Sequence, residues 1–169
     1  MKFIEFIDKE ITSRGFSPAM IEALRLVKEN RFDPIVLKKR VSEYGLSVVD
    51  LKSESMLFYV DFARYILLDD HIDENEMNTA KRLKLLFKIR EGDFMSDNFH
   101  NQIKMIIQEQ SDKFYRDNAI DDRESVAKVR LQELFDLGYD QYLSMEHEII
   151  ESALKRGADS KDLDTYYKL

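Results

Sequence analysis

The sequence predicts an all-α protein of about eight helices, a compact bundle containing two pseudo-symmetric helix–loop–helix units. Glycine and proline are scarce, at five and two among 169 residues, whereas a strand-rich fold needs many tight turns. Apolar residues recur at the three- and four-residue spacing of amphipathic helices along most of the chain. An acidic octet occurs twice, 48 residues apart, which indicates a duplicated supersecondary unit.

The first helices are predicted from residue types that commonly begin or end a helix. An apolar stripe begins at Phe3 and stops near Gly15. The Ser-Pro pair at residues 17–18 has the form of an N-cap followed by proline at the first helical position. The Asp-Pro pair at residues 33–34 repeats this signal before a helix that we expect to end at Gly45.

The remaining helices follow from apolar spacing and from further cap signals. We expect them over residues 47–68, 74–91, 97–116, 122–137 and 140–157. Gly138 and Gly157 close the last two of these helices, and Asp140 is the expected cap of the final one. The stretch from Gly92 to Ser96 carries no clear signal.

The chain is short enough for one domain and long enough to bury a sizeable core. We expect residues 1–46 to be appended N-terminal helices and residues 47–157 to form the main helical domain. Residues 158–169 are a polar C-terminal tail. Because no linker composition interrupts the sequence, a single compact domain is the expected arrangement.

The acidic octet spans residues 69–76 and returns at residues 117–124, and the apolar residues after it return as well. Six core positions are predicted from this match: Leu83, Leu86 and Phe87 in the first copy, and Leu131, Leu134 and Phe135 in the second.

Helix capping explains most of the octet without a ligand. Asp73 and Asp121 lie where an N-cap belongs, and a glutamate follows each of them three residues later. This spacing completes a capping box, in which each residue of the pair bonds the other's backbone N–H group. The carboxylates also lie at the helix N-terminus, where the macrodipole favours negative charge.

Some acidic residues of the octets are not needed for helix capping. Asp69 and Asp117 precede the expected caps by four residues and are not needed for them. Hard oxygen ligands at this density suit Ca²⁺, Mg²⁺ or Mn²⁺. The spacing is not that of an EF-hand, because Glu74 replaces the loop glycine and Ala80 replaces the last ligand. Capping alone and cation binding therefore both stay open.

The pattern Asp-x-x-Ile-Asp-x-x-Glu, found twice in a small acidic helical chain, resembles the TerB-like family of tellurite-resistance proteins. The resemblance covers about residues 51–155. It departs from the family pattern at a glycine and at a capping serine. It implies a pseudo-symmetric helical bundle with a role in bacterial stress or chemical defence. It also implies an acidic cluster suspected of binding a divalent cation, which maps by motif onto Asp69, Glu76, Asp117 and Glu124.

Composition excludes several functional classes. The net charge of −7 makes the chain a poor nucleic-acid binder, because such binding depends on neutralising phosphates. There is no cysteine, so disulfides, thiolate metal sites and cysteine nucleophiles are impossible. No apolar run approaches the length of a membrane span, and charges interrupt the N-terminus, which is unlike a signal peptide. A cytoplasmic protein without membrane insertion is the expectation.

We expect a non-enzymatic binding module with a protein partner, because no motif supplies a nucleophile or a general base and no catalytic residue can be named. Two alternatives stay open: a metal-dependent hydrolase that uses the same carboxylates, and an acidic immunity-type or antitoxin-like protein that masks a basic partner. The oligomeric state is not indicated. Asp61 lies among aromatic residues, where Arg64 or Tyr65 is a candidate structural partner at helical spacing.

Overall fold

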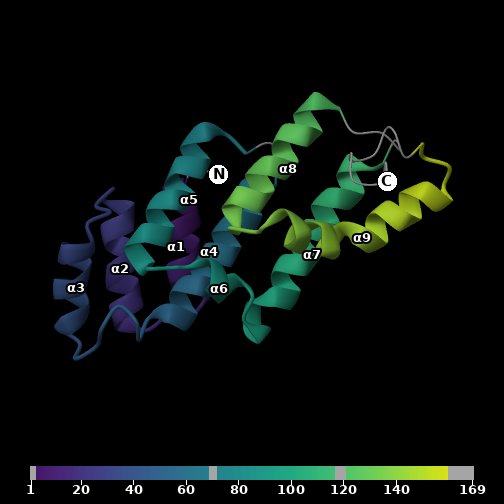
Figure 1. Cartoon of the computed structure of the whole chain (residues 1–169). Helices are drawn as coiled ribbons and strands as arrows, with labels where there is room; N and C mark the ends of the chain where they lie inside the picture. The colour runs from purple at the N-terminus through teal and green to yellow at the C-terminus, as the bar shows by residue number, and fades with distance from the viewer. Residues whose placement is uncertain (1–2, 69–71, 117–120, 160–169) are drawn as a thin grey trace. The chain divides into compact units, whose positions relative to one another are not determined.

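The all-α prediction is confirmed. The computed structural model describes residues 3–68, 72–116 and 121–159, and within these ranges it contains nine helices and no strand (Figure 1). The helices are α1 (Phe3–Ser13), α2 (Pro18–Lys28), α3 (Pro34–Ser42), α4 (Lys52–Ile66), α5 (Glu74–Phe87), α6 (Glu91–Phe94), α7 (Asp97–Phe114), α8 (Asp122–Leu134) and α9 (Tyr139–Lys155). The short α6 overlaps residues 92–96, which carry no clear helix signal in the sequence.

The chain divides into two compact units, Met1–Asp93 and Phe94–Leu169. Helices α1 to α5 belong to the first unit and α7 to α9 to the second. The division into residues 1–46, 47–157 and 158–169 stays a prediction.

Aromatic side chains form much of the core of the first unit, where α1 packs against α2 and α4. The ring of Phe6 on α1 lies 5.6 Å from that of Phe58 and 6.1 Å from that of Phe62, both on α4. All three residues are buried. Helix α3 packs against α2 and α5 in the same unit.

The predicted caps of the second and third helices are confirmed. The Ser17 hydroxyl accepts a hydrogen bond from the Met20 N–H group at the start of α2. The Asp33 carboxylate accepts from the backbone N–H groups of Ile35 and Val36 at the start of α3. In both helices proline occupies the first turn, where its missing N–H group costs no intrahelical bond.

In the second unit α7 packs along α9. Tyr115, Ile150 and Ala153 form a buried cluster, and the Phe94 and Phe135 rings meet edge to face at 5.8 Å. Helix α9 begins at Tyr139 with Gly138 at its N-cap, so the prediction that Asp140 caps this helix is wrong. The Gly138 N–H group instead donates to the side-chain oxygen of Gln141.

The two copies of the repeat have the same local structure in the parts that the structure describes. The six predicted core residues are all buried: Leu83, Leu86, Phe87, Leu131, Leu134 and Phe135. Lys88 and Asp136, 48 residues apart, both have a left-handed backbone, with φ of 53° and 50°. The predicted closure of α8 at Gly138 is therefore wrong, because Asp136 makes that turn, and aspartate tolerates the left-handed region better than most residues.

The match extends to the preceding helices. Helices α4 and α7 end at Ile66 and Phe114, which are also 48 residues apart. The repeating unit is thus longer than the octet and the helix that follows it.

Candidate functional site

Both acidic octets form capping boxes, as the capping interpretation predicted. Oδ1 of Asp73 accepts from the Glu76 N–H group at 2.8 Å, and Oε2 of Glu76 accepts from the Asp73 N–H group at 2.8 Å. The pair Asp121 and Glu124 repeats both bonds at 2.8 and 2.9 Å. One oxygen of each glutamate is therefore committed to the backbone of its own helix.

The four predicted cation ligands are only partly covered by the structure. Asp69 and Asp117 lie outside the described residues. Glu76 belongs to the first unit and Glu124 to the second. Among the described residues, no three or more histidine, aspartate or glutamate side chains converge as metal ligands would. The cation site stays a prediction that rests on the sequence.

A buried ion pair lies in the second unit. Lys128 on α8 donates from Nζ to Oε1 of Glu146 on α9 at 2.8 Å and to the phenolic oxygen of Tyr115, which follows α7, at 2.9 Å. The lysine and glutamate side chains are 5% and 1% exposed. The Ser111 hydroxyl on α7 donates to the second glutamate oxygen at 3.1 Å. This polar cluster of Ser111, Tyr115, Lys128 and Glu146 joins all three helices.

A fifth side chain adjoins this polar cluster. Nζ of Lys128 lies 5.6 Å from the centre of the Tyr142 ring. Burial, and then the charge of Glu146, raise the pKa of the Tyr142 phenol well above its usual range. The phenol therefore stays neutral at any physiological pH. The cluster carries one positive and one negative charge, and no cysteine or histidine belongs to it.

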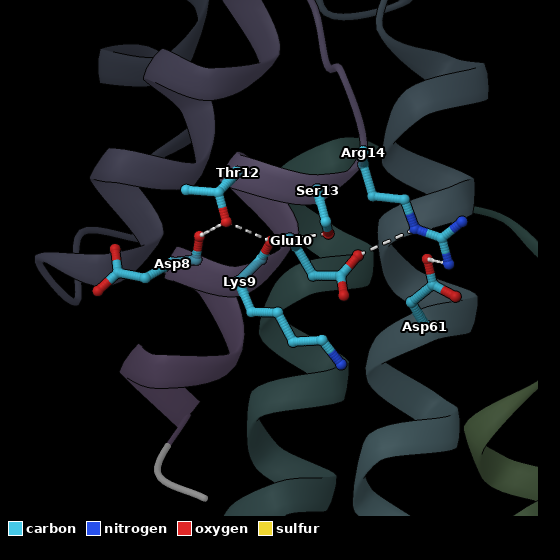
Figure 2. A network of polar contacts seen from close by, with 7 residues as sticks. All are labelled: Asp8, Lys9, Glu10, Thr12, Ser13, Arg14 and Asp61. Carbon is cyan, nitrogen blue, oxygen red and sulfur yellow. Dashed lines mark hydrogen bonds and ion pairs between the residues drawn. The ribbon is translucent and has the colours of Figure 1, made fainter.

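A second polar cluster lies in the first unit (Figure 2). Arg14 lies 2.6 Å from an Asp61 oxygen and 3.2 Å from a Glu10 oxygen, so one guanidinium serves two carboxylates (Figure 2). Burial, and then the neighbouring Asp61 charge, raise the pKa of Glu10. Arg14 is thus an ion-pair partner of Asp61 that the sequence interpretation did not name. This contact ties α1 to α4.

The outward face of α8 is unusual in composition. Asp122, Val126, Val129 and Glu133 are spaced by four, three and four residues, so they share one helix face, and all four are exposed. Val126 is 51% exposed and Val129 is 63% exposed. We call this set of four residues the α8 stripe: two valines flanked by two carboxylates.

Elsewhere in the described parts of the chain, exposed large apolar residues do not form such a pair on one helix face. Ile35 on α3, Leu85 on α5 and Met105 on α7 are each exposed singly, which is common on protein surfaces. On α5 the residues that match the two valines of α8 are Asn78 and Lys81, as expected for a solvent-facing side. The paired valines are therefore specific to the second copy of the repeat.

Comparisons with protein-family models, with curated proteins and with solved structures find no match for this chain. The TerB-like resemblance thus stays a prediction that rests on the repeated motif. Within the described residues, no helix is long and apolar enough to cross a membrane.

The capping boxes and the buried ion pair differ in how far apart their residues lie in the sequence. The capping boxes could be predicted because all their atoms lie within four residues of one another. The Lys128–Glu146 pair is non-local, and in isolation Lys128 looks like an ordinary surface residue. One available signal was the repeat itself, which places Lys128 at the position of Ala80.

Proposed function

We propose that this chain is a non-enzymatic binding module, of a stress- or defence-associated type, whose second unit docks a basic protein segment. The observation that carries this proposal is the α8 stripe. Val126 and Val129 are neighbours on one exposed face of α8 and offer an apolar contact. The flanking carboxylates select for positive charge in the partner.

The distribution of charge supports a basic partner. Residues 1–93 contain 16 basic and 17 acidic residues, whereas residues 94–169 contain 10 basic and 16 acidic residues. The net charges are therefore −1 and −6, so most of the net negative charge belongs to the second unit. A field of one sign steers oppositely charged partners and raises their rate of association.

The end of α8 supports the same interpretation. Its last turn contains no basic residue and includes Glu133, although a helix C-terminus favours positive charge. The matching position on α5 is Leu85. Glu133 adds a negative charge to the exposed face of α8 that carries the two valines.

The probe for this proposal is a synthetic amphipathic helix with two leucines on one face and arginines on either side of them. Its affinity for the full chain is measured by fluorescence anisotropy. A second peptide, with glutamates in place of the arginines, is the charge control. We expect binding of the basic peptide only, and weaker binding as the salt concentration rises from about 50 to about 500 mM.

The matched protein variants are Val126→Ser with Val129→Ser, and Leu85→Ser as the control. We expect the double variant to bind the basic peptide at least about tenfold more weakly, because the apolar centre of the contact is lost. Leu85 is 74% exposed, so its replacement removes a comparable apolar surface outside the stripe and should leave binding unchanged. Equal loss in both variants, or binding of the acidic peptide, would contradict the proposal.

A further inference from the structure

The two copies of the repeat differ in their cores at matched positions. Three buried apolar residues of the first copy have buried polar counterparts in the second. The matched pairs are Ala63 with Ser111, Leu67 with Tyr115, and Ala80 with Lys128. Because the first copy forms the same helices with apolar residues, the fold itself does not require the polar cluster.

The polar cluster also changes how α8 is held. Helix α5 buries Met77 and Ala80 in its first two turns. The matching residues of α8 are Ser125, which is exposed, and Lys128, the only buried residue in the first nine of this helix. The buried contact of the first half of α8 with α7 and α9 is therefore made by a charged side chain.

A buried ion pair resists separation less than apolar packing does. Desolvation of the two charges offsets much of their attraction in the folded state, and both charges regain water when the helices part. Apolar side chains that become exposed when two helices part regain no favourable hydration. The first half of α8 should thus separate from its neighbours more readily than the first half of α5.

Lys128 lies on the inward face of α8. Successive residues of an α-helix are rotated by about 100°, so an inward Lys128 directs Val126 and Val129 away from the core. Apolar patterning favours the same rotation, because Leu131 and Phe135 follow Lys128 by three and seven residues and are buried on the same side of the helix. The bonds from Lys128 to Tyr115 and Glu146 hold the first half of this face against α7 and α9.

We infer that Lys128 is a positioning residue and that residues 122–130 form a releasable segment, which undocks from α7 and α9 while the rest of the second unit stays folded. The segment that undocks is the one that displays the valines of the α8 stripe. The second copy of the repeat is in this respect a modified version of the first, in which a static core helix has become a mobile one.

Hydrogen exchange of the full chain tests this inference without any variant. After correction for intrinsic rates, the amides of residues 126–131 should exchange at least about tenfold faster than those of residues 78–83. They should also exchange faster than the central amides of α7 and α9. Exchange of α8 as slow as that of α5, or at one common rate for α7, α8 and α9, would overturn the inference.

Paired variants test the cause of the opening. Lys128→Met with Glu146→Met replaces the ion pair by apolar side chains of similar length, and we expect exchange of residues 126–131 to slow at least about tenfold. Lys104→Met with Glu148→Met is the control, because it removes another ion pair of the second unit, between α7 and α9, that is largely exposed. Slowing in the control, or none in the first variant, would refute a positioning role for Lys128.

The link between the releasable segment and peptide binding rests on the proposed function. If the basic peptide binds the α8 stripe, it should slow exchange of residues 126–131 and leave residues 78–83 unchanged. Peptide binding without this slowing would refute the coupling and leave the docking proposal intact. Rapid exchange of α8 together with no peptide binding would refute the docking proposal and leave the releasable segment intact.

Discussion

Replacing one member of the buried ion pair should be far more harmful than replacing both. We expect Lys128→Met alone to lower the free energy of unfolding of the second unit by about 3–5 kcal/mol, because Glu146 then keeps a buried charge without its lysine. Replacing both residues by methionine should be neutral or stabilising by about 1–4 kcal/mol.

The expected changes in the free energy of unfolding follow from the distance between the two charged groups. Nζ of Lys128 and Oε1 of Glu146 are 2.8 Å apart. At an effective dielectric constant of about 20, this separation gives a gross attraction of about 6 kcal/mol. Desolvation costs several kcal/mol for each ion, so the pair contributes little in net terms. A single replacement removes the attraction and leaves one desolvation cost in place.

Urea denaturation followed by far-UV circular dichroism measures these differences for the wild type, both single variants and the double variant. If the two units unfold in separate transitions, only that of the second unit should shift. The double variant should be more stable than either single variant. A double variant that loses about the sum of the two single losses would refute the reasoning, because it would show that the two residues act independently.

Three other predictions follow from the caps, the first unit and the acidic loops. Asp73→Ala and Asp121→Ala should each lower stability by about 1 kcal/mol in urea denaturation, and unchanged stability in both would contradict the observed caps. The raised pKa of Glu10 means that the folded state holds this proton more tightly than the unfolded state, so this contribution to stability is lost as pH rises through the raised pKa. Glu10→Gln should therefore gain stability relative to the wild type on going from about pH 4 to about pH 7, and a difference that is constant with pH would count against this account. If the acidic loops bind a cation, about millimolar Ca²⁺, Mg²⁺ or Mn²⁺ should raise the melting temperature of the wild type and not that of an Asp69→Asn, Asp117→Asn double variant, whereas no shift in the wild type would end the cation hypothesis.

Local signals were sufficient for much of the fold. The caps at Ser17, Asp33, Asp73 and Asp121 could be predicted because each one depends on atoms within three residues of the cap. The end of α8 was missed because glycine was preferred for the left-handed position. Both copies in fact end in the same way: the N–H groups of Ile89 and Leu137, which follow the left-handed Lys88 and Asp136, donate to the carbonyl five residues back.

Contacts between distant residues were beyond prediction from one sequence. Asp61 was expected to bond a neighbour on its own helix, whereas Arg14 reaches it from the end of α1. Helical spacing identifies partners three or four residues away, and it says nothing of a residue that another helix brings close. The same limit hid the bond from Lys128 to Glu146, which lies 18 residues later.

Comparison of the two copies reaches further than either copy alone. Both begin with the same capping box, both bury leucines and phenylalanine in the second half of the helix, and both end in a left-handed residue. These shared features are sufficient to form the helix, so they account for the fold. What remains different is the first half of α8, with a lysine inside and two valines outside, which opposes the apolar pattern that stabilises α5. Departures of this kind from local consistency are expected at functional positions, because stability alone gives no reason to keep them. For this reason we propose α8, and not the acidic loops, as the functional surface; in the octets Asp73, Glu76, Asp121 and Glu124 serve as helix caps.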